Sequence, residues 1–144
     1  VADWGNNRVQ KFSAQGRYQM SFDGADGGAG SLDHPAGVAV DSDGDVYVTD
    51  WGNNRVQIYG PDGEVLTALY GDVHELSRAG LYNLNRDPES VKVLNRIEDL
   101  MPVLKAFLRP TGIAIDTKDR IVVSDARSRL MVYVKDNEYV EPPA

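Results

Sequence analysis

The chain has 144 residues, 22 acidic against 15 basic side chains, a formal net charge of −7 and no cysteine. Nucleic-acid backbones are bound by basic surfaces, so this balance argues against nucleic acid as a general partner, and no polybasic stretch suits an anionic membrane. The absence of cysteine excludes disulfides and thiolate metal sites in this segment, and no apolar run in the sequence has the length of a membrane span.

The chain begins inside a phrase that it later repeats. Val1–Phe12 (VADWGNNRVQKF) returns as Val48–Tyr59 (VTDWGNNRVQIY), and a weaker, shorter copy lies at Val123–Tyr133 (VSDARSRLMVY). A period of about 40–50 residues on β-type sequence is typical of sheets that bury their faces by stacking, as in β-propellers. Three partial copies are too few for a ring of roughly four to eight blades. We therefore expect a piece of a larger propeller, or a small protein that completes its ring by oligomerising.

The first half of the chain is predicted to hold the end of one blade and one complete blade. Residues 1–22 form the end of the first blade, and 23–71 form a glycine-rich crossover (23–33) followed by the complete blade. Alternating and β-branched residues predict four antiparallel strands there, joined by tight turns in which Gly44 and Gly63 take positive φ. The predicted strands are Gly37–Val40, Val46–Thr49, Arg55–Tyr59 and Val65–Leu69.

Residues 72–108 interrupt the repeat with a predicted α-helical insertion. Asp87 is a good N-cap and Pro88 suits the first helical position, so a helix is expected over about 88–101. Pro102 is expected to kink this helix or to start a second short one. Further apolar residues follow Pro102: Leu104, Phe107 and Leu108. Such an insert usually packs on its own domain, and the alternative is a docking surface or lid for a partner. Apolar residues recur at helical spacing through the segment: Val91, Leu94, Ile97 and Met101.

The last part of the chain, 109–144, is predicted to be most of a further blade. Arg109–Asp125 matches His34–Asp50, and Tyr139-Val140 would begin the last strand. The predicted fold class is therefore all-β, with blades of four antiparallel strands and one α-helical insertion.

The best-preserved copy resembles the NHL-repeat signature. The resemblance lies in Pro35-x-Gly-Val-Ala-Val-Asp41, Gly44-Asp-Val-Tyr-Val-Thr-Asp50 and Asn54-Arg-Val-Gln-Ile-Tyr59, and extends over most of 1–71 and 109–134. It implies a β-propeller, most often six-bladed, whose members mainly bind other molecules. Bacterial relatives include extracellular sensor and cell-surface proteins, which favours an extracytoplasmic location. One related branch is a zinc-dependent amidating lyase that uses several histidines, whereas this chain has only His34 and His74.

Loops expected on one face of such a propeller supply the candidate binding residues. The loops after second strands contribute Trp4, Arg8, Trp51, Asn53, Arg55 and Arg127, and the crossovers contribute His34 and Arg109. Exposed Trp beside Asn and Arg suits stacking and hydrogen bonding to a peptide, sugar or base. The alternative is structural, because each Asp of the repeat can pair with the following Arg and each Trp can pack on the next blade. The recurrence of these residues in every unit favours the structural alternative, because a ligand contact need not repeat. His34 and Arg109 are less constrained by the repeat, so that argument applies to them least.

Asp41, Asp43 and Asp45 resemble the first part of a calcium loop. The third copy has Lys118 and Arg120 where the later carboxylates stood, and no bidentate Glu follows, so a solvated hairpin turn is the favoured interpretation. The sequence thus predicts no metal beyond this weak calcium candidate, and no cofactor.

The favoured functional hypothesis is a scaffold module that binds a protein or peptide, or the remaining blades, within a larger protein or assembly. No nucleophile elbow, Ser/His/Asp set or paired acid–base carboxylates stand out, which favours a non-enzymatic role. The alternative is part of a propeller enzyme, of the lactone-hydrolase or amidating-lyase type, with a metal at the central channel.

Overall fold

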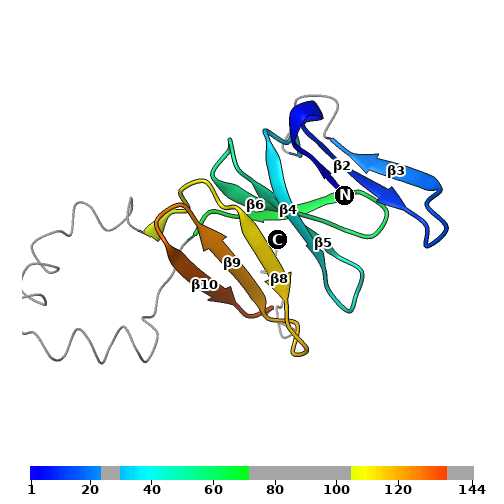
Figure 1. The fold of residues 1–144 in the computed structure, drawn as a ribbon. Helices are drawn as coiled ribbons and strands as arrows, with labels where there is room; N and C mark the ends of the chain where they lie inside the picture. The colour runs from blue at the N-terminus through cyan, green and yellow to red at the C-terminus, as the bar shows by residue number, and fades with distance from the viewer. Residues whose placement is uncertain (24–29, 72–104, 136–144) are drawn as a thin grey trace, which may run out of the picture.

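The computed structural model describes residues 1–23, 30–71 and 105–135, and these residues form three antiparallel sheets (Figure 1). The strand orders are β1-β2-β3, β4-β5-β6-β7 and β8-β9-β10, and a short 3-10 helix, η1 (Trp4–Asn6), connects β1 to β2. The strands are β1 (Ala2–Asp3), β2 (Arg8–Phe12), β3 (Tyr18–Phe22), β4 (Pro35–Val40), β5 (Val46–Asp50), β6 (Arg55–Tyr59), β7 (Val65–Leu69), β8 (Gly112–Ile115), β9 (Ile121–Asp125) and β10 (Arg129–Tyr133). Within the described residues, no helix is long and apolar enough to cross a membrane.

The second sheet is the complete four-stranded unit, and its strands closely follow the prediction. β6 and β7 have the predicted bounds, and the turns before β5 and β7 place Gly44 and Gly63 at φ 90° and 91°. β4 begins two residues earlier than predicted, at Pro35. Pro35 pairs with Asp50 across a register shift, which a proline tolerates because it is the first residue of its strand.

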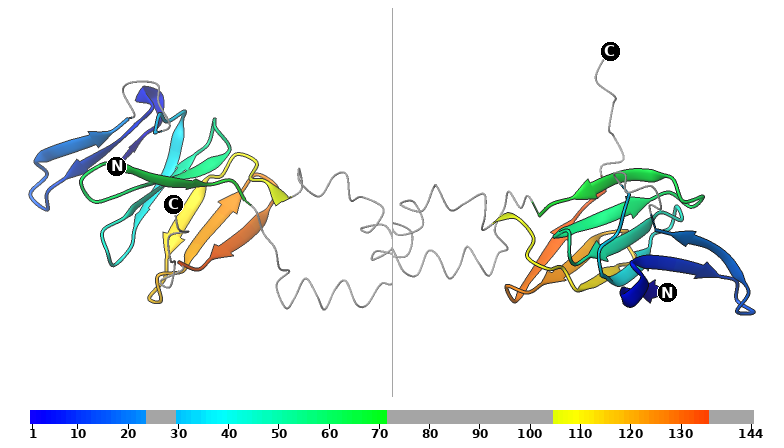
Figure 2. Two further views of the ribbon diagram at one scale, coloured as in Figure 1. Left: turned by 180° about the vertical axis from the view of Figure 1, so that it is seen from behind. Right: turned by 90° about the horizontal axis from the view of Figure 1, so that it is seen from above.

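Two apolar cores separate the three sheets, because alternate residues of the second sheet point to opposite sides. Every residue of β5 is buried. Towards the first sheet lies a core of Val9, Phe22, Leu32, Val46, Val48 and Tyr59. Towards the third sheet lies a core of Tyr47, Val56, Ile58, Phe107, Ile121, Val123 and Met131. The second sheet therefore lies between the other two, an order that Figure 2 shows from behind and from above.

The strands β4 and β8 lie side by side where the second and third sheets converge (Figure 1). Thr49 donates a hydrogen bond from its Oγ1 to the Thr111 carbonyl over 3.2 Å. A Cβ on Gly37 would lie only 2.9 Å from that same oxygen. The small residues of β4 are therefore explained by the close approach of neighbouring sheets, as expected for the innermost strand of a propeller blade.

The predicted helix over 88–101 and the predicted strand at Tyr139-Val140 lie outside the described residues. Phe107, near the end of the apolar pattern of the insertion, is not helical. Its N–H donates to the Tyr70 carbonyl over 2.9 Å, and its side chain is buried in the core between the second and third sheets. Burial of a large ring in that core accounts for the apolar residue at this position.

Candidate functional site

The repeated loop is organised around an aspartate at the end of a strand. Asp50 ends β5 with its side chain fully buried, and its Oδ2 accepts hydrogen bonds from Asn53 Nδ2 at 2.9 Å and Arg55 Nε at 2.8 Å. The same ion pair joins Asp3 to Arg8 in the first sheet and Asp125 to Arg129 in the third. The pairing of Asp with the following Arg is thus confirmed in all three copies.

These aspartates also hold the chain that enters the next strand. Asp50 Oδ1 accepts a hydrogen bond from the Asp33 N–H at 2.7 Å, and Asp125 Oδ2 accepts one from the Leu108 N–H at 3.2 Å. These donors stabilise the negative charge of the Asp125 carboxylate. Burial raises the pKa of Asp125, but the hydrogen bonds from Arg129 and from the backbone outweigh burial, so the pKa lies below its ordinary value.

A second connection crosses each junction between sheets. The side chain of Asn7 accepts the His34 N–H at 2.9 Å, and the side chain of Asn54 accepts the Arg109 N–H at 2.8 Å. All four residues take the left-handed conformation, with φ between 49° and 55°. Asparagine adopts this conformation readily, whereas for histidine and arginine it is uncommon and has to be held by surrounding bonds. We call this Asn-to-backbone bond the inter-sheet stitch.

The stitch brings four side chains together on one face, which we call the loop-face cluster: Trp4, His34, Trp51 and Arg109. The Trp4 ring lies 5.0 Å from His34 and 5.1 Å from Trp51, centroid to centroid, and the Arg109 guanidinium carbon lies 4.5 Å from the centre of the Trp51 ring. Trp4 is 43% exposed and Arg109 is also exposed. The cluster thus combines residues from all three sheets into a partly exposed aromatic and cationic surface.

An aspartate that was not predicted as a site residue belongs to this surface. Asp33 Oδ1 lies 2.5 Å from His34 Nδ1, and both side chains are nearly half exposed. Asp33 packs so closely on Gly52 that a Cβ there would overlap its carboxylate. The only signal in the sequence is a departure from the repeat, because Leu108 occupies the equivalent place before Arg109.

The other predicted binding residues are engaged in their own loops. Arg8 pairs with Asp3, and Arg55 and Asn53 both donate to Asp50 and to the Ser31 carbonyl. Arg127 donates from its N–H to Asp125 and from its guanidinium to the Ala106 carbonyl. A role for these residues in ligand binding stays a prediction.

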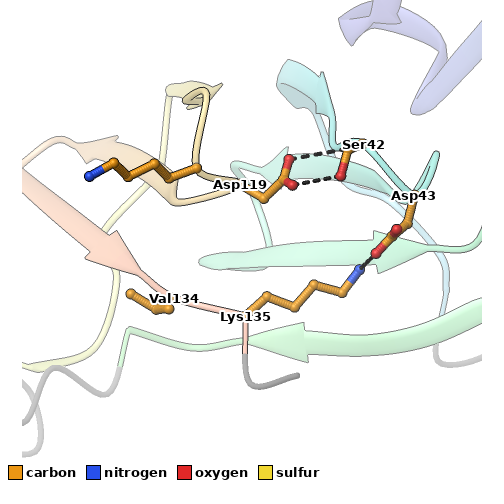
Figure 3. Close-up of a pocket in the computed structure, with 6 residues that line it drawn as sticks. Ser42, Asp43, Asp119, Val134 and Lys135 are labelled. Atoms are coloured by element: carbon orange, nitrogen blue, oxygen red, sulfur yellow. Dashed lines mark hydrogen bonds and ion pairs between the residues drawn. The ribbon is translucent and has the colours of Figure 1, made fainter. Parts of the chain in front are cut away.

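At the opposite end of the second sheet, three carboxylates surround one ammonium group. Lys135 Nζ lies 3.1, 2.7 and 2.8 Å from carboxylate oxygens of Asp41, Asp43 and Asp45. Figure 3 shows Lys135 reaching Asp43, and Ser42 bonded to Asp119 across the junction. These four residues line a cavity of about 320 Å³. Burial raises the pKa of Asp41, but bonds from Lys135 and Tyr47 outweigh it and lower the pKa below its ordinary value.

Lys135 is thus a structural partner of the turn that carries Asp41, Asp43 and Asp45. Burial lowers the pKa of Lys135, whereas the three carboxylates raise it further, so its net pKa lies well above the ordinary value. The ammonium of Lys135 occupies the point towards which these side chains converge. Across 1–23, 30–71 and 105–135, no group of three or more His, Asp or Glu side chains is placed to hold a metal ion. The weak calcium candidate formed by Asp41, Asp43 and Asp45, to which a hairpin turn was preferred, stays untested.

Comparisons with known proteins find a family-model match inside the second sheet. Residues 32–59 match the model of the NHL repeat. Curated proteins give no significant match. Solved structures similar to the chain include a virginiamycin B lyase from Staphylococcus aureus (11% identity, TM-score 0.43, covering 90% of this chain and 35% of that one). Another is a streptogramin B lyase (14% identity, TM-score 0.46, covering 94% and 36%).

The chain thus spans about a third of the length of those two structures, 35% and 36%. The matched residues 32–59 cover the end of the crossover and strands β4, β5 and β6 of the complete sheet. The repeated phrase, the antiparallel sheets stacked face to face and this match agree. Residues 32–59 therefore carry an NHL repeat, and the described chain is all-β, with antiparallel sheets of three and four strands.

Proposed function

We propose that this chain is the part of a propeller that binds a protein or peptide partner through the loop-face cluster. The observation that carries the proposal is the separation of roles at His34 and Arg109. Their backbone N–H groups make the inter-sheet stitch, while their side chains rest on the rings of Trp4 and Trp51. The stitch needs no particular side chain at either position, so these side chains are available for binding.

The composition of the cluster supports a macromolecular partner. Trp and Arg are enriched where protein surfaces bind one another, because each combines a large contact area with hydrogen-bond donors. Trp4 and Trp51 lie side by side, so together they offer more apolar surface than either ring alone. Repeat proteins commonly bind partners on a surface assembled from successive units, and here three sheets contribute.

Selection of peptides from a display library on the immobilised chain tests the proposal. Binders are then measured against Trp4→Ala and Trp51→Ala variants, which we expect to weaken binding by about tenfold or more, as for interface hot spots. Tyr18→Ala is the matched control, because Tyr18 is a 57% exposed aromatic residue of β3 outside the cluster.

The control should bind like the unchanged chain. Circular dichroism melts confirm that each variant remains folded. Binders that tolerate both tryptophan substitutions, or a library that yields none, would contradict the proposed function.

A further inference from the structure

Arg109 differs from the repeat arginines in the way its charge is compensated. Arg8, Arg55 and Arg129 are each paired with an aspartate of their own loop. Arg109 has no carboxylate partner within the described parts of the chain and rests on the Trp51 ring, with its guanidinium carbon 4.5 Å from the ring centre. Its positive charge is therefore presented on the loop face.

Stacking leaves the hydrogen-bonding edge of a guanidinium available. The five N–H donors of arginine lie in the plane of the group, and the Arg109 guanidinium carbon lies over the Trp51 ring rather than beside a carboxylate of the described residues. The donors match the two oxygens of a carboxylate in a fork geometry, and the aromatic contact restricts the orientation of the group before a ligand arrives. Arg109 is thus suited to bind a planar anion.

The neighbouring carboxylate is directed elsewhere. Asp33 is bonded to the His34 ring, and that ring lies 5.0 Å from Trp4 and 6.1 Å from Trp51. The Asp33 carboxylate is thus bonded to His34, and the guanidinium of Arg109 is available to a ligand. The exposed Trp4 indole and the partly buried Trp51 indole favour flat or apolar groups.

We infer that the loop-face cluster binds a peptide that presents a carboxylate beside a flat or apolar side chain. The carboxylate lies against Arg109 and the apolar group against Trp4 and Trp51. The Trp51 ring contacts both Trp4 and Arg109, so the two subsites are close enough for adjacent residues of one peptide, whose Cα atoms are about 3.8 Å apart. This inference rests on the proposed function and adds the chemistry of the partner.

The charge of the chain favours a carboxylate over a phosphate. A phosphate group carries about −1.5 to −2 charges at neutral pH, which one arginine does not balance. The chain itself has a net charge of −7, and Asp33 lies beside the cluster, against His34. A singly charged carboxylate suits this setting better than a phosphorylated side chain does.

Tryptophan fluorescence tests the inference directly, because the chain has two tryptophans and both belong to the cluster. The probes are acetyl-Gly-Glu-Phe-Gly-amide, its Gln analogue and its phosphoserine analogue, titrated into the full chain with excitation selective for indole. We expect the Glu peptide to bind about tenfold more tightly than the Gln peptide, as for a charge-assisted hydrogen bond.

Substitution of Arg109 tests whether this residue causes the preference for the Glu peptide over the Gln peptide. Arg109→Gln should remove the preference for Glu over Gln, and Arg109→Lys should keep only part of it, because lysine lacks the planar fork. Arg17→Gln is the matched control, since Arg17 is exposed in the turn between β2 and β3, at the other end of β2 from the loop that carries Trp4. The control should retain the full preference.

The outcomes separate this inference from the proposed function. Equal binding of the Glu and Gln peptides, lost in Trp51→Ala, would overturn the carboxylate preference while supporting a peptide-binding face. Tighter binding of the phosphoserine peptide would also overturn it. If none of the three peptides changes the fluorescence at millimolar concentration, the inference is wrong, and the display selection alone decides the proposed function.

Discussion

The junction between the first and second sheets and the junction between the second and third share one hydrogen-bonding scheme and expose different chemistry. In both, an asparagine side chain accepts the N–H of a residue that precedes a proline, and both partners are left-handed. The side chain presented at that point is His34 in the first junction and Arg109 in the second. A constant backbone connection thus supports a variable surface.

The opposite ends of the two junctions differ more strongly. At the first, Lys11 Nζ donates to the Pro61 carbonyl over 3.1 Å in an exposed contact. At the second, Lys135 meets three carboxylates and Ser42 bonds to Asp119. We call the contact of Lys135 with Asp41, Asp43 and Asp45 the charged lock of the second junction. The corresponding end of the first junction has the exposed hydrogen bond of Lys11. The loop-face connection is thus the same at both junctions, whereas the contacts at the other end depend on individual residues.

The largest expected effect concerns the buried aspartate of the second sheet. Asp50→Ala removes the acceptor for Arg55, Asn53 and the Asp33 N–H, and leaves the mostly buried Arg55 uncompensated. We expect the free energy of unfolding to fall by about 3 kcal/mol, as for other broken buried pairs. Urea unfolding followed by circular dichroism measures it. Asp3→Ala is the matched control in a more exposed copy of the loop, and it should lower the free energy of unfolding by less. Equal decreases in the two variants would contradict the importance of burial.

The charged lock should have an intermediate effect. Lys135→Met removes the cation beside Asp41, whose side chain is 1% exposed, and should lower the free energy of unfolding by about 2 kcal/mol. Lys118→Met is the control, because Lys118 lines the same cavity without an ion pair to these carboxylates. A similar loss in both variants would show that the lock contributes nothing specific.

The effect of Lys135 should also depend on pH in a defined direction. The pKa of Asp41 in the folded chain is lowered from 3.8, so its contribution is complete above that value and is lost as pH falls through the lowered pKa. The raised pKa of Lys135 places its own loss above 10.5. The difference in stability between the unchanged chain and Lys135→Met should be constant from about pH 5 to 8 and should shrink in acid below 3.8. A difference that grows in acid would refute this assignment.

The smallest expected effect tests whether the two stitches are equivalent. Asn54→Gly keeps the left-handed conformation accessible but removes the acceptor for the Arg109 N–H, so the free energy of unfolding should fall by about 1 kcal/mol. Asn7→Gly should cause a similar loss through the His34 N–H. Thermal melts of the two variants measure the difference. A marked inequality would mean that the junctions are not held in the same way.

The local structure of the complete sheet could be predicted because it depends on neighbours along the chain. Alternation and β-branched residues place β6 and β7 at their predicted bounds, and glycines with positive φ make the turns that join strands. The pairing of each repeat aspartate with its arginine was also foreseeable, since both belong to one short loop. Local pattern could not decide the environment of Phe107, because an apolar residue at helical spacing fits a core position equally well.

The surface of the site was decided by tertiary structure. Nothing in the order of residues states that Arg109 rests on Trp51, that Asp33 binds the His34 ring, or that Asp41, Asp43 and Asp45 converge on Lys135. These contacts arise only when separate sheets pack and their left-handed residues set the direction of the side chains. By itself the sequence determined the repeated antiparallel unit and its internal ion pairs, because those forces act within one unit. The exposed combination of rings and charge required the stacking of three units, because each contributes only part of it.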